Sequence, residues 1–545
     1  MGRAGNGVMI SAMDALASTA PGGPIRRIVI VGGGSAGWLT AAVLAAEHGG
    51  PGGLEITLLE SPDVGPIGVG EGTWPTMRDT LRKVGLPETE LVRQCDASFK
   101  QGSRFDGWRD GSAGDHYHHP FVLPQGYTEA DLVSAWLQQH AELPFADLVS
   151  FQPHLCAQGR APKQAGTPEY AAVANYGYHF DAGRFGLLLK AHCTERLGVR
   201  HLLGHVEAIH SHDNGDIASL GTRQHGRVDG ELFVDCTGMA SLLLGRHYGV
   251  PWVSQRHVLF NDSALAVQVP HARDDAPIAS QTIATAQAGG WIWDIGLPTR
   301  RGVGHVYSSA HTTDEAVEAA LMRYVQGSGG GLSRAGSAAP APRKLRFQPG
   351  FRQEFWHRNC VAVGLSAGFV EPLEASALAL VELSAALISE DLPATRAHMD
   401  IVARRFNESF AYRWQRVIDF LKLHYALSRR TDTAYWREHA EPASWPERLR
   451  ELLALWQHRP PSRHDFTRAE ELFPSASYQY VLYGMGFRPQ AGLRALGQPQ
   501  ARQADADKAD GFFREAAALT RRMLPALPSN RELVEHVMRH GMLRI

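Results

Sequence analysis

The chain has few cysteines, and none of them is arranged as a metal ligand. Its 545 residues include five cysteines, which are scattered and form no Cys-x-x-Cys pair. Structural zinc sites and secreted disulfide scaffolds both depend on several cysteines at regular spacing. The sequence therefore argues against both, and it predicts a protein of a reducing compartment, the cytoplasm.

The chain also lacks an excess of charge and any long apolar run. Its net charge is −2 at pH 7, which gives no support for a nucleic-acid or membrane-surface partner. No apolar run approaches the 18 residues that a membrane-spanning helix needs. Residues 1–24 are rich in Gly, Ala and Ser and lack the basic start and apolar core of a secretory signal, so we expect a disordered leader.

What the chain does contain is a glycine loop between an apolar strand pattern at 27–31 and an apolar stretch that begins at Leu39. Gly32, Gly34 and Gly37 occupy the three positions of the dinucleotide-binding fingerprint. These positions serve a tight turn, a close approach of backbone to pyrophosphate, and a close strand–helix contact. The free N–H groups at the start of the following helix favour a phosphate.

A second predicted strand, residues 54–60, ends in Glu60, about 23 residues after Gly37. An acidic residue at that distance accepts hydrogen bonds from a ribose hydroxyl in dinucleotide-binding folds. Downstream, three glycines within residues 68–72 would let backbone lie close against a flat ligand. A flavin contact is favoured there over an ordinary loop.

Three further patterns leave their chemistry open when each is taken alone. Residues 115–121 read Asp-His-Tyr-His-His-Pro-Phe, and no fourth ligand at zinc spacing is evident, so an aromatic, hydrogen-bonding wall is favoured over a metal site. Trp291 and Trp293 share one face of a predicted strand, as either a rigid aromatic surface or a core pair. N–H groups near Ser376 and Ala377, at a predicted helix start, could hold a small anion.

We predict a mixed α/β (α+β) fold with two main parts. Residues 25–390 form a Rossmann-like, FAD-binding core with an inserted antiparallel sheet, whose strands lie around 257–268 and 282–308, and a linker-like loop at 327–342. A strand at 206–209 returns to the nucleotide-binding unit. Residues 391–545 form a mostly helical, substrate-side region, with breaks at 458–464, 474–478 and 488–508.

In this order the segments resemble the flavin-dependent tryptophan halogenases. The resemblance runs from about Ile25 to beyond Gly486. It rests on the glycine loop followed by Trp38, Gly-Val-Gly-Glu at 68–71, Phe-Lys at 99–100, Asp-His-x-x-His-x-Phe at 115–121, Trp-x-Trp at 291–293 and Glu-Pro-Leu-Glu at 371–374.

The resemblance assigns an expected role to each matching position. Lys100 falls on the active-site lysine and Glu374 on its partner carboxylate. The substrate pocket matches His119, Phe121, Trp291 and Trp293, and the two backbone N–H groups that hold halide match Ser376 and Ala377. The expected flavin contacts are Gly32, Gly33, Gly34, Ala36, Gly37, Glu60, Ser61, Ile67, Val69, Gly72, Val206, Leu365 and Leu378.

The resemblance implies a two-component halogenase. Reduced FAD, O₂ and chloride or bromide would yield hypohalous acid, which reaches Lys100. There the ammonium group either hydrogen-bonds the acid or becomes a haloamine, and the oxidant halogenates tryptophan, indole or another electron-rich aromatic. No second nucleotide-binding loop is apparent, so a separate NAD(P)H-flavin reductase is expected to supply reduced FAD. A homodimer is compatible with the sequence. The alternatives are a flavin-dependent aromatic monooxygenase and a flavin-binding redox sensor or scaffold.

Three departures from the family pattern bear on specificity. Pro298 is displaced in Trp-Ile-Trp-Asp-Ile-Gly-Leu-Pro, and Ala377 stands where the family has glycine, which adds a methyl group beside the halide. The chain looks short between Phe466 and Gly486, where free-tryptophan halogenases clasp the amino acid. Indole, a substituted indole, a peptide-borne ring and other aromatics therefore stay open as substrates.

Overall fold

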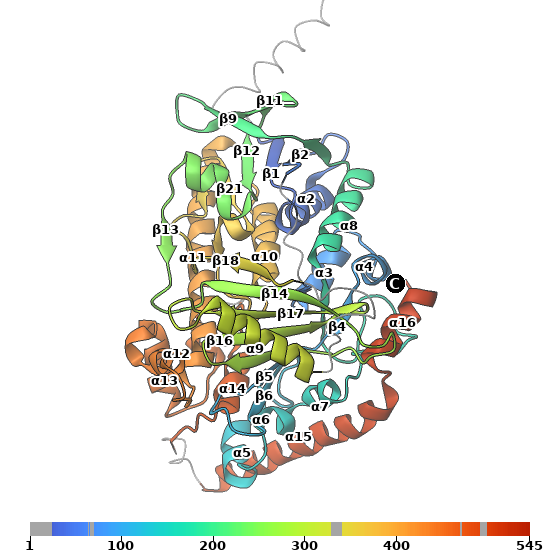
Figure 1. Ribbon diagram of the computed structural model, residues 1–545, viewed down its shortest axis with the longest axis vertical. Coiled ribbons are helices and arrows are strands. Elements are labelled where there is room, and N and C mark those ends of the chain that lie inside the picture. Colours follow the sequence, from blue (N-terminus) through green and yellow to red (C-terminus); the bar gives the residue numbers. More distant parts are fainter. Residues whose placement is uncertain are drawn as a thin grey trace, which may run out of the picture.

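The structure is a computed structural model that describes residues 24–63, 65, 70–328, 341–468, 471–490 and 499–544. Figure 1 shows the arrangement of the elements. The predicted leader, apart from residue 24, lies outside the described residues. So do Ile67, Val69 and residues 329–340 of the predicted linker-like loop.

A six-stranded sheet carries the glycine loop. Its strand order is β20-β21-β12-β1-β2-β8, with β1 (Arg27–Val31) parallel to both β2 (Glu55–Glu60) and β12 (Leu232–Asp235). The other three strands are β8 (Arg200–Leu203), β21 (Cys360–Ala362) and the antiparallel β20 (Trp356–His357), and β8 and β20 lie at the edges. Strand β1 is buried because parallel sheets are covered on both faces, which explains its unbroken apolar run. Helix α2 (Ser35–His48) follows β1, and the Rossmann-like prediction is confirmed.

A seven-stranded, largely antiparallel sheet lies below the first one in the view of Figure 1. Its order is β18 (Arg343–Arg346), β14 (Ser263–Pro270), β17 (Arg300–Tyr307), β16 (Gly290–Gly296), β15 (Thr282–Gln287), β5 (Gly102–Asp106) and β6 (His116–Pro120). Helix α9 (Asp314–Gly327) covers one face. The predicted inserted sheet is confirmed, and β5 and β6 extend it with residues from far upstream.

A short three-stranded sheet brings two predicted site residues to one place. Strand β7 (Gly177–Asp181) pairs antiparallel with β3 (Gly70–Gly72) on one side and β4 (Ser98–Lys100) on the other. The register sets Gly72 and Ser98 opposite the same residue, His179. Lys100 therefore ends a strand that is held rigidly beside the glycine-rich stretch.

The strand expected at 206–209 exists, but it does not return to the parallel sheet. Strand β9 (Val206–Ser211) joins β10 (Ile217–Thr222) and β11 (Gly226–Asp229) in a separate antiparallel sheet. The preceding strand, β8, takes the place beside β2. Strand β9 is too polar and exposed for a parallel sheet with both faces covered. Strand β14 likewise begins at Ser263 rather than near 257.

The region after residue 391 is helical, as predicted. It contains α11 (Arg396–Ala426), α12 (Ala434–Ala440), α13 (Glu447–Trp456), α14 (Ser475–Gly484), α15 (Pro499–Ala526) and α16 (Asn530–His540). The expected break at 474–478 was wrong, because Pro474 is the N-cap of α14 and the serines after it lie in the first turn. The break at 488–508 was drawn too long, since α15 begins at Pro499.

The remaining elements surround these sheets. The helices are α3 (Thr76–Lys83), α4 (Glu88–Gln94), α5 (Leu132–Gln139), α6 (Phe145–Val149), α7 (Gln152–Ala157), α8 (Ala182–Glu195) and α10 (Ser376–Glu390). A small sheet joins β13 (Trp252–Ser254), β19 (Gly350–Arg352) and β22 (Gly368–Phe369).

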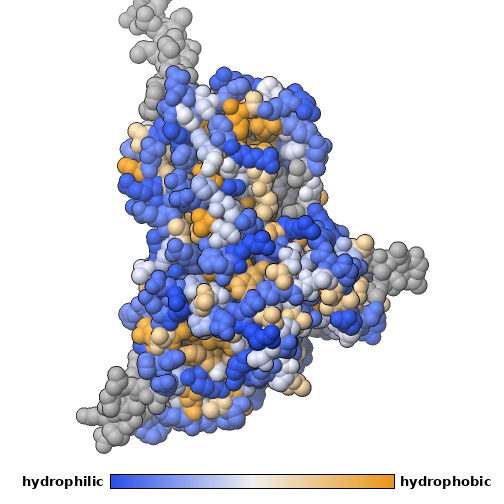
Figure 2. Space-filling model, turned by 60° about the vertical axis from the view of Figure 1, so that its left-hand side comes forward, coloured by the Kyte–Doolittle hydropathy of each residue, from blue (hydrophilic) through white to orange (hydrophobic). Residues whose placement is uncertain are grey.

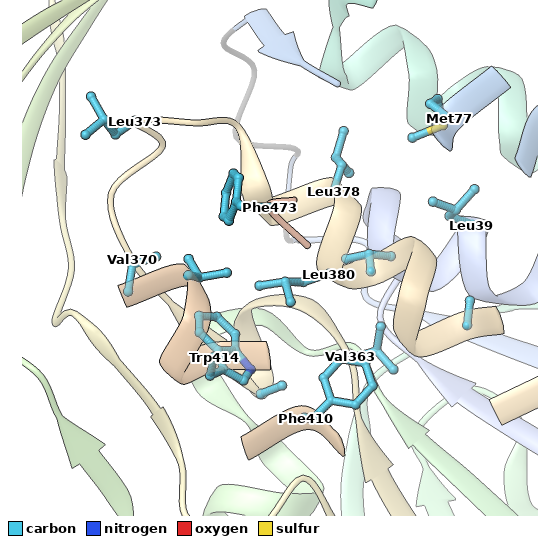
Figure 3. Close-up of a cluster of buried hydrophobic side chains, with 14 of the residues drawn as sticks. Leu39, Met77, Val363, Val370, Leu373, Leu378, Leu380, Phe410, Trp414 and Phe473 are labelled. Carbon is cyan, nitrogen blue, oxygen red and sulfur yellow. The ribbon is translucent and has the colours of Figure 1, made fainter. Parts of the chain in front are cut away.

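One large cluster of buried apolar side chains runs through the molecule. Figure 3 shows part of it, where Leu39 of α2, Leu378 of α10 and Phe410 of α11 contribute to one core. Phe473, from the segment before α14, lies beside Leu378 in this view. The helices after residue 391 thus share their core with the nucleotide-binding unit, and a domain boundary at 390 stays a prediction.

The face drawn in Figure 2 is mainly hydrophilic, with apolar side chains gathered in separate patches. Among the coloured residues of that face, no single apolar surface stands out, and the homodimer stays a prediction. None of the helices in the described part of the chain is both long enough and apolar enough to cross a membrane.

Candidate active site

The glycine loop has the geometry that a dinucleotide phosphate requires. Gly32 has a φ of +117°, and a Cβ there would collide with the Cys236 carbonyl. A Cβ on Gly37 would collide with the Gly32 carbonyl, which fixes the close contact between strand and helix. Gly34 differs, because a Cβ there would meet no atom within 4 Å, and no side chain caps helix α2. The open side of the loop and the uncapped N–H groups fit a pyrophosphate.

Glu60 lies directly against this loop. A Cβ on Gly33 would collide with the Glu60 side chain, and Lys190 Nζ donates to Glu60 Oε2 at 3.0 Å. His201 Nε2 lies 2.8 Å from the same oxygen. The Gly204 N–H donates to the Glu60 carbonyl, so the start of β9, where Val206 lies, stays close to the end of β2.

Four other expected flavin contacts come from segments near the same loop. Ala36, in the first turn of α2, is so close to Gly364 that a Cβ on Gly364 would lie 2.8 Å from the Ala36 Cβ. Leu365 follows in a short 3₁₀ turn and is half-buried. Leu378, in the first turn of α10, is buried, whereas Ser61 is half-buried after β2.

Lys100 is buried inside the molecule, with only 1% of its surface exposed. A Cβ on Gly72 would lie 3.2 Å from Lys100 Nζ and 3.4 Å from the Ala375 Cβ, so these three residues meet at one point. The Phe121 ring centroid lies 5.4 Å from the ammonium group. Burial lowers the pKa of Lys100 to about 8, although the facing carboxylates of Glu374 and Glu71 act in the opposite direction.

Glu374 is also buried, and two imidazoles face one of its oxygens. His119 Nδ1 lies 2.9 Å from Glu374 Oε1, and His424 Nε2 lies 3.2 Å from the same atom. Only the His119 contact has regular hydrogen-bond geometry; the His424 contact is bent. Burial alone would raise the pKa of Glu374, but His119 and His424 overcome this effect and hold it at about 2. The carboxylate form is therefore favoured at neutral pH.

The start of α10 offers backbone N–H groups beside this carboxylate. Ala375, the N-cap, has a φ of +54°, and its side chain provides no cap. This left-handed conformation is strained for alanine, so the surrounding structure must hold it in place. Ser376 is buried and Ala377 is exposed. The uncapped N–H groups and the positive end of the helix fit a small anion at the expected place.

Trp291 and Trp293 are both buried and do not form an open aromatic surface. Trp291 is fully buried, and its indole N–H donates to Glu371 Oε2 at 2.7 Å. Trp293 is 6% exposed, and the two ring centroids lie 6.4 Å apart. Asn261 and Tyr425 also donate to Glu371 Oε2. This arrangement braces the segment that carries Glu374, and a substrate contact for either tryptophan stays a prediction.

A sequence profile described as tryptophan halogenase matches residues 27–500. The chain belongs to the tryptophan halogenase family. Tryptophan 6-halogenase SttH from Streptomyces toxytricini is 33% identical over 530 residues, which are 93% of this chain and 97% of the relative.

Two solved halogenase structures share the whole fold. A tryptophan halogenase from Shewanella frigidimarina is 48% identical, with a TM-score of 0.90 over 96% of this chain and 99% of its own. BrvH, a flavin-dependent halogenase from Brevundimonas sp., is 33% identical, with a TM-score of 0.81 over 94% and 99%. The enzyme is thus a flavin-dependent halogenase by family. The names of these relatives differ in whether they specify tryptophan.

Several residues around the halogenase site were missed by the sequence analysis. The Trp74 indole N–H donates to the Glu374 carbonyl at 2.7 Å, and Phe473 packs edge-on against Trp74. His179 faces Lys100. Burial and the positive charge of Lys100 both lower the pKa of His179. Trp74 follows a recognised glycine motif, which was a usable signal. Phe473 and His424 lie in segments without any motif, and only the fold brings them here.

The side chains of the histidine-rich stretch of this halogenase lie in different environments. Asp115 Oδ2 accepts the N–H groups of Asp110 and Gly111 and closes a turn. His118 lies 3.6 Å from Asp147, whereas His119 faces Glu374. Within the described residues, no group of three or more His, Cys, Asp or Glu side chains could hold a metal ion.

Proposed function

We propose that this protein is a two-component halogenase that uses reduced FAD, O₂ and chloride or bromide to halogenate an electron-rich aromatic, with indoles as the substrate class. The observation that carries the proposal is a buried lysine, Lys100, facing a buried carboxylate, Glu374, beside the uncapped start of α10. Bound reduced FAD would supply, with O₂, the oxidising power that converts halide into hypohalous acid.

The flavin would be held by the glycine loop and Glu60. The phosphates fit the open side of Gly34 and the start of α2, and Glu60 accepts from a ribose hydroxyl. The halide would be held by the backbone N–H groups of Ser376 and Ala377. Because backbone groups make these contacts, a change of side chain preserves them, but the Ala377 methyl reduces the space for the larger bromide.

Lys100 would hold the hypohalous acid by donating a hydrogen bond from its ammonium group. With a pKa of about 8, most molecules carry the ammonium at pH 7. Its burial fixes the direction of the N–H bonds, and this orientation selects one ring carbon for an oxidant that is otherwise unselective. The side chains proposed to orient the ring are those of His119, Phe121, Trp291 and Trp293, and the Phe121 ring centroid lies 5.4 Å from the ammonium.

Glu374 would stabilise the cationic ring and take its proton. The ring carbon donates an electron pair to the halogen, and the oxygen–halogen bond breaks. The departing oxygen takes a proton from the Lys100 ammonium and leaves as water. The ring C–H proton passes to Glu374, and its electron pair restores aromaticity. Return of that proton from Glu374 to the Lys100 amine resets both residues.

Reduced FAD is proposed to come from a separate NAD(P)H-flavin reductase, and the protein is proposed to work in the cytoplasm. All five cysteines are buried and unpaired, which supports a reducing compartment. A homodimer remains a compatible assembly.

The test is a product analysis with the purified protein, chemically or enzymatically reduced FAD, O₂, bromide and a panel of indoles. A product that carries bromine on one ring position supports the proposal. Hydroxylated product without brominated product would favour an aromatic monooxygenase instead. If the Lys100→Ala variant binds FAD and its turnover equals that of the wild type, a redox sensor would be favoured.

A further inference from the structure

A chain of contacts leads from Tyr117 of β6 through His424 of α11 to Glu374. The Tyr117 hydroxyl lies 2.6 Å from His424 Nδ1, and His424 Nε2 lies 3.2 Å from Glu374 Oε1. Tyr117 is 3% exposed, and His424 is fully enclosed. The Phe105 ring lies 4.6 Å from the imidazole centroid, so packing restricts the ring of His424 as well.

These contacts assign the protons on His424. Burial raises the pKa of Tyr117 well above 10, so its hydroxyl stays protonated and can donate. Burial lowers the pKa of His424, so the imidazole is neutral near pH 7. A neutral imidazole that accepts at Nδ1 must carry its proton on Nε2. The nitrogen that carries this proton lies 3.2 Å from Glu374 Oε1, although the contact is bent.

Both imidazole contacts fall on the same carboxylate oxygen. His119 and His424 each meet Glu374 Oε1, and no hydrogen bond from any described residue falls on Oε2. The Trp74 indole meanwhile fixes the backbone carbonyl of Glu374. Oε2 is therefore the oxygen left to accept a ring proton.

We propose that His424, fixed in one tautomer by Tyr117, is a positioning residue that occupies Glu374 Oε1 and leaves Oε2 to serve as the base toward the aromatic substrate. This inference rests on the proposed function. Because Nε2 already carries a proton, His424 does not accept the one taken from the ring. The proton stays on Glu374 until it returns to Lys100.

Two other buried carboxyls, which have no imidazole partner, indicate how strongly the imidazoles lower the pKa of Glu374. Glu382 is a buried carboxyl that accepts only from the hydroxyls of Thr76 and Thr80, and burial raises its pKa to about 8. Glu71, beside Lys100, has its pKa raised by burial to about 7. In these two carboxyls, which have no imidazole partner, burial thus raises the pKa to neutral pH or above.

The groups that face Glu374 come from three elements. They are Tyr117 and His119 of β6, His424 of α11 and Lys100 of β4. Glu71 of β3 faces Lys100 rather than Glu374. Loss of His424 leaves His119 and Lys100 to favour the carboxylate against burial, so the carboxylate form should be lost at a higher pH than in the wild type.

Variants of His424 separate positioning from a structural role. His424→Phe keeps a buried ring and removes the donor, whereas His424→Gln places an amide N–H near the position of Nε2. We expect kcat to fall about tenfold or more in His424→Phe, with KM for the indole and FAD affinity within about twofold of wild type. The wild-type kcat should stay level down to about pH 5, whereas His424→Phe should lose activity below about pH 6. His424→Gln should recover most of both effects.

Tyr117→Phe tests the tautomer separately. It should shift the pH profile in the same direction but less, since the imidazole remains. Tyr483→Phe is the matched control, because the Tyr483 hydroxyl is buried without a hydrogen-bond partner on the neighbouring helix α14. It should leave kcat and the pH profile unchanged. Equal pH profiles for Tyr117→Phe, His424→Phe and wild type would overturn the proposal.

Infrared spectra of the protein without flavin supply a readout besides activity. For the wild type and for His424→Phe, the spectrum of the same protein with Glu374→Gln is subtracted. The difference spectrum isolates the bands of the Glu374 carboxyl. At pH 5.5 we expect carboxylate bands in the wild type and a protonated carboxyl in His424→Phe. Carboxylate bands in both would reject the positioning role even if the enzyme halogenates. A wild type that makes no halogenated product would instead reject the proposed function, whatever the spectra show.

Discussion

His119 and Glu374 are 255 residues apart in the chain, yet the imidazole Nδ1 and the carboxylate Oε1 lie 2.9 Å apart. The histidine comes from an edge strand of the large antiparallel sheet, and the glutamate from the loop before α10. Their contact closes one side of a buried site whose other charged group is Lys100.

Removal of the Glu374 charge should slow the chemical step. Glu374→Gln keeps the size and removes the base, so kcat should fall about 10²- to 10⁴-fold. FAD affinity should stay unchanged, because the glycine loop and Glu60 make the expected flavin contacts. Single-turnover assays with preformed hypohalous acid, together with flavin titration, would check both. A kcat within threefold of wild type would show that Glu374 is not the base.

The activity should depend on the charge of Lys100. The pKa of about 8 means that the ammonium predominates below this pH and the amine above it. If the ammonium donates to hypohalous acid, kcat should be level near pH 7 and fall about tenfold per pH unit well above pH 8. A rate that rises through pH 8 would instead identify the neutral amine, and hence a haloamine, as the reactive form.

Lys100 should also reduce the stability of the folded protein. Its folded pKa, about 8, lies below the ordinary value of 10.5, so the ammonium form destabilises the folded state below about pH 8. The penalty disappears as the pH rises from about 8 to 10.5. Lys100→Met should therefore raise the free energy of unfolding at pH 7 by about 3 kcal/mol, and the gain should vanish near pH 10.5. Denaturant titrations at the two pH values would measure it.

The same substitution at Lys163 should have the opposite effect. Lys163 Nζ lies 2.7 Å from Glu88 Oε2, and both side chains are fully buried. Lys163→Met leaves the Glu88 carboxylate without its ion partner, and unfolding should become easier by about 3–5 kcal/mol. An equal response of the two lysine variants would contradict the assignment of Lys100 as a functional rather than a structural buried charge.

Two glycines of the flavin loop should separate binding from folding. A Cβ at Gly34 meets no protein atom, so Gly34→Ala should fold normally and lose flavin affinity by about tenfold or more, because its methyl points into the space proposed for the phosphates. A Cβ at Gly37 collides with the Gly32 carbonyl, so Gly37→Ala should destabilise the fold itself. Thermal melts with and without FAD would distinguish the two. Full flavin affinity in Gly34→Ala would argue against a phosphate at this loop.

The sequence predicted the parts of the fold that depend on local pattern. The apolar run at β1, the glycine spacing and Glu60 indicate a nucleotide-binding unit because each position has its own local reason. The alternation at β9 indicated a strand but could not identify its partner strands. The pattern at 474–478 predicted a break, although serine and proline also begin helices.

The residues of the site also fall into those that the sequence could predict and those that it could not. Lys100 and Glu374 were found only because the order of several motifs resembles a family, since a single lysine carries no signal. Tyr117 lay inside a recognised motif, but its contact with His424 depends on how α11 packs against β6. Spacing along the chain cannot predict a contact across 307 residues. The charged groups were thus predictable, whereas the residues that orient them were not.

Mass spectrometry of the products should show whether Lys100 delivers the halogen. Wild type and Lys100→Ala are each supplied with reduced FAD, O₂, bromide and an indole. We expect a singly brominated indole from the wild type. From Lys100→Ala we expect no brominated product above the level formed by free hypobromous acid, with FAD binding retained. Regioselective bromination by Lys100→Ala at the wild-type rate would contradict this role of Lys100.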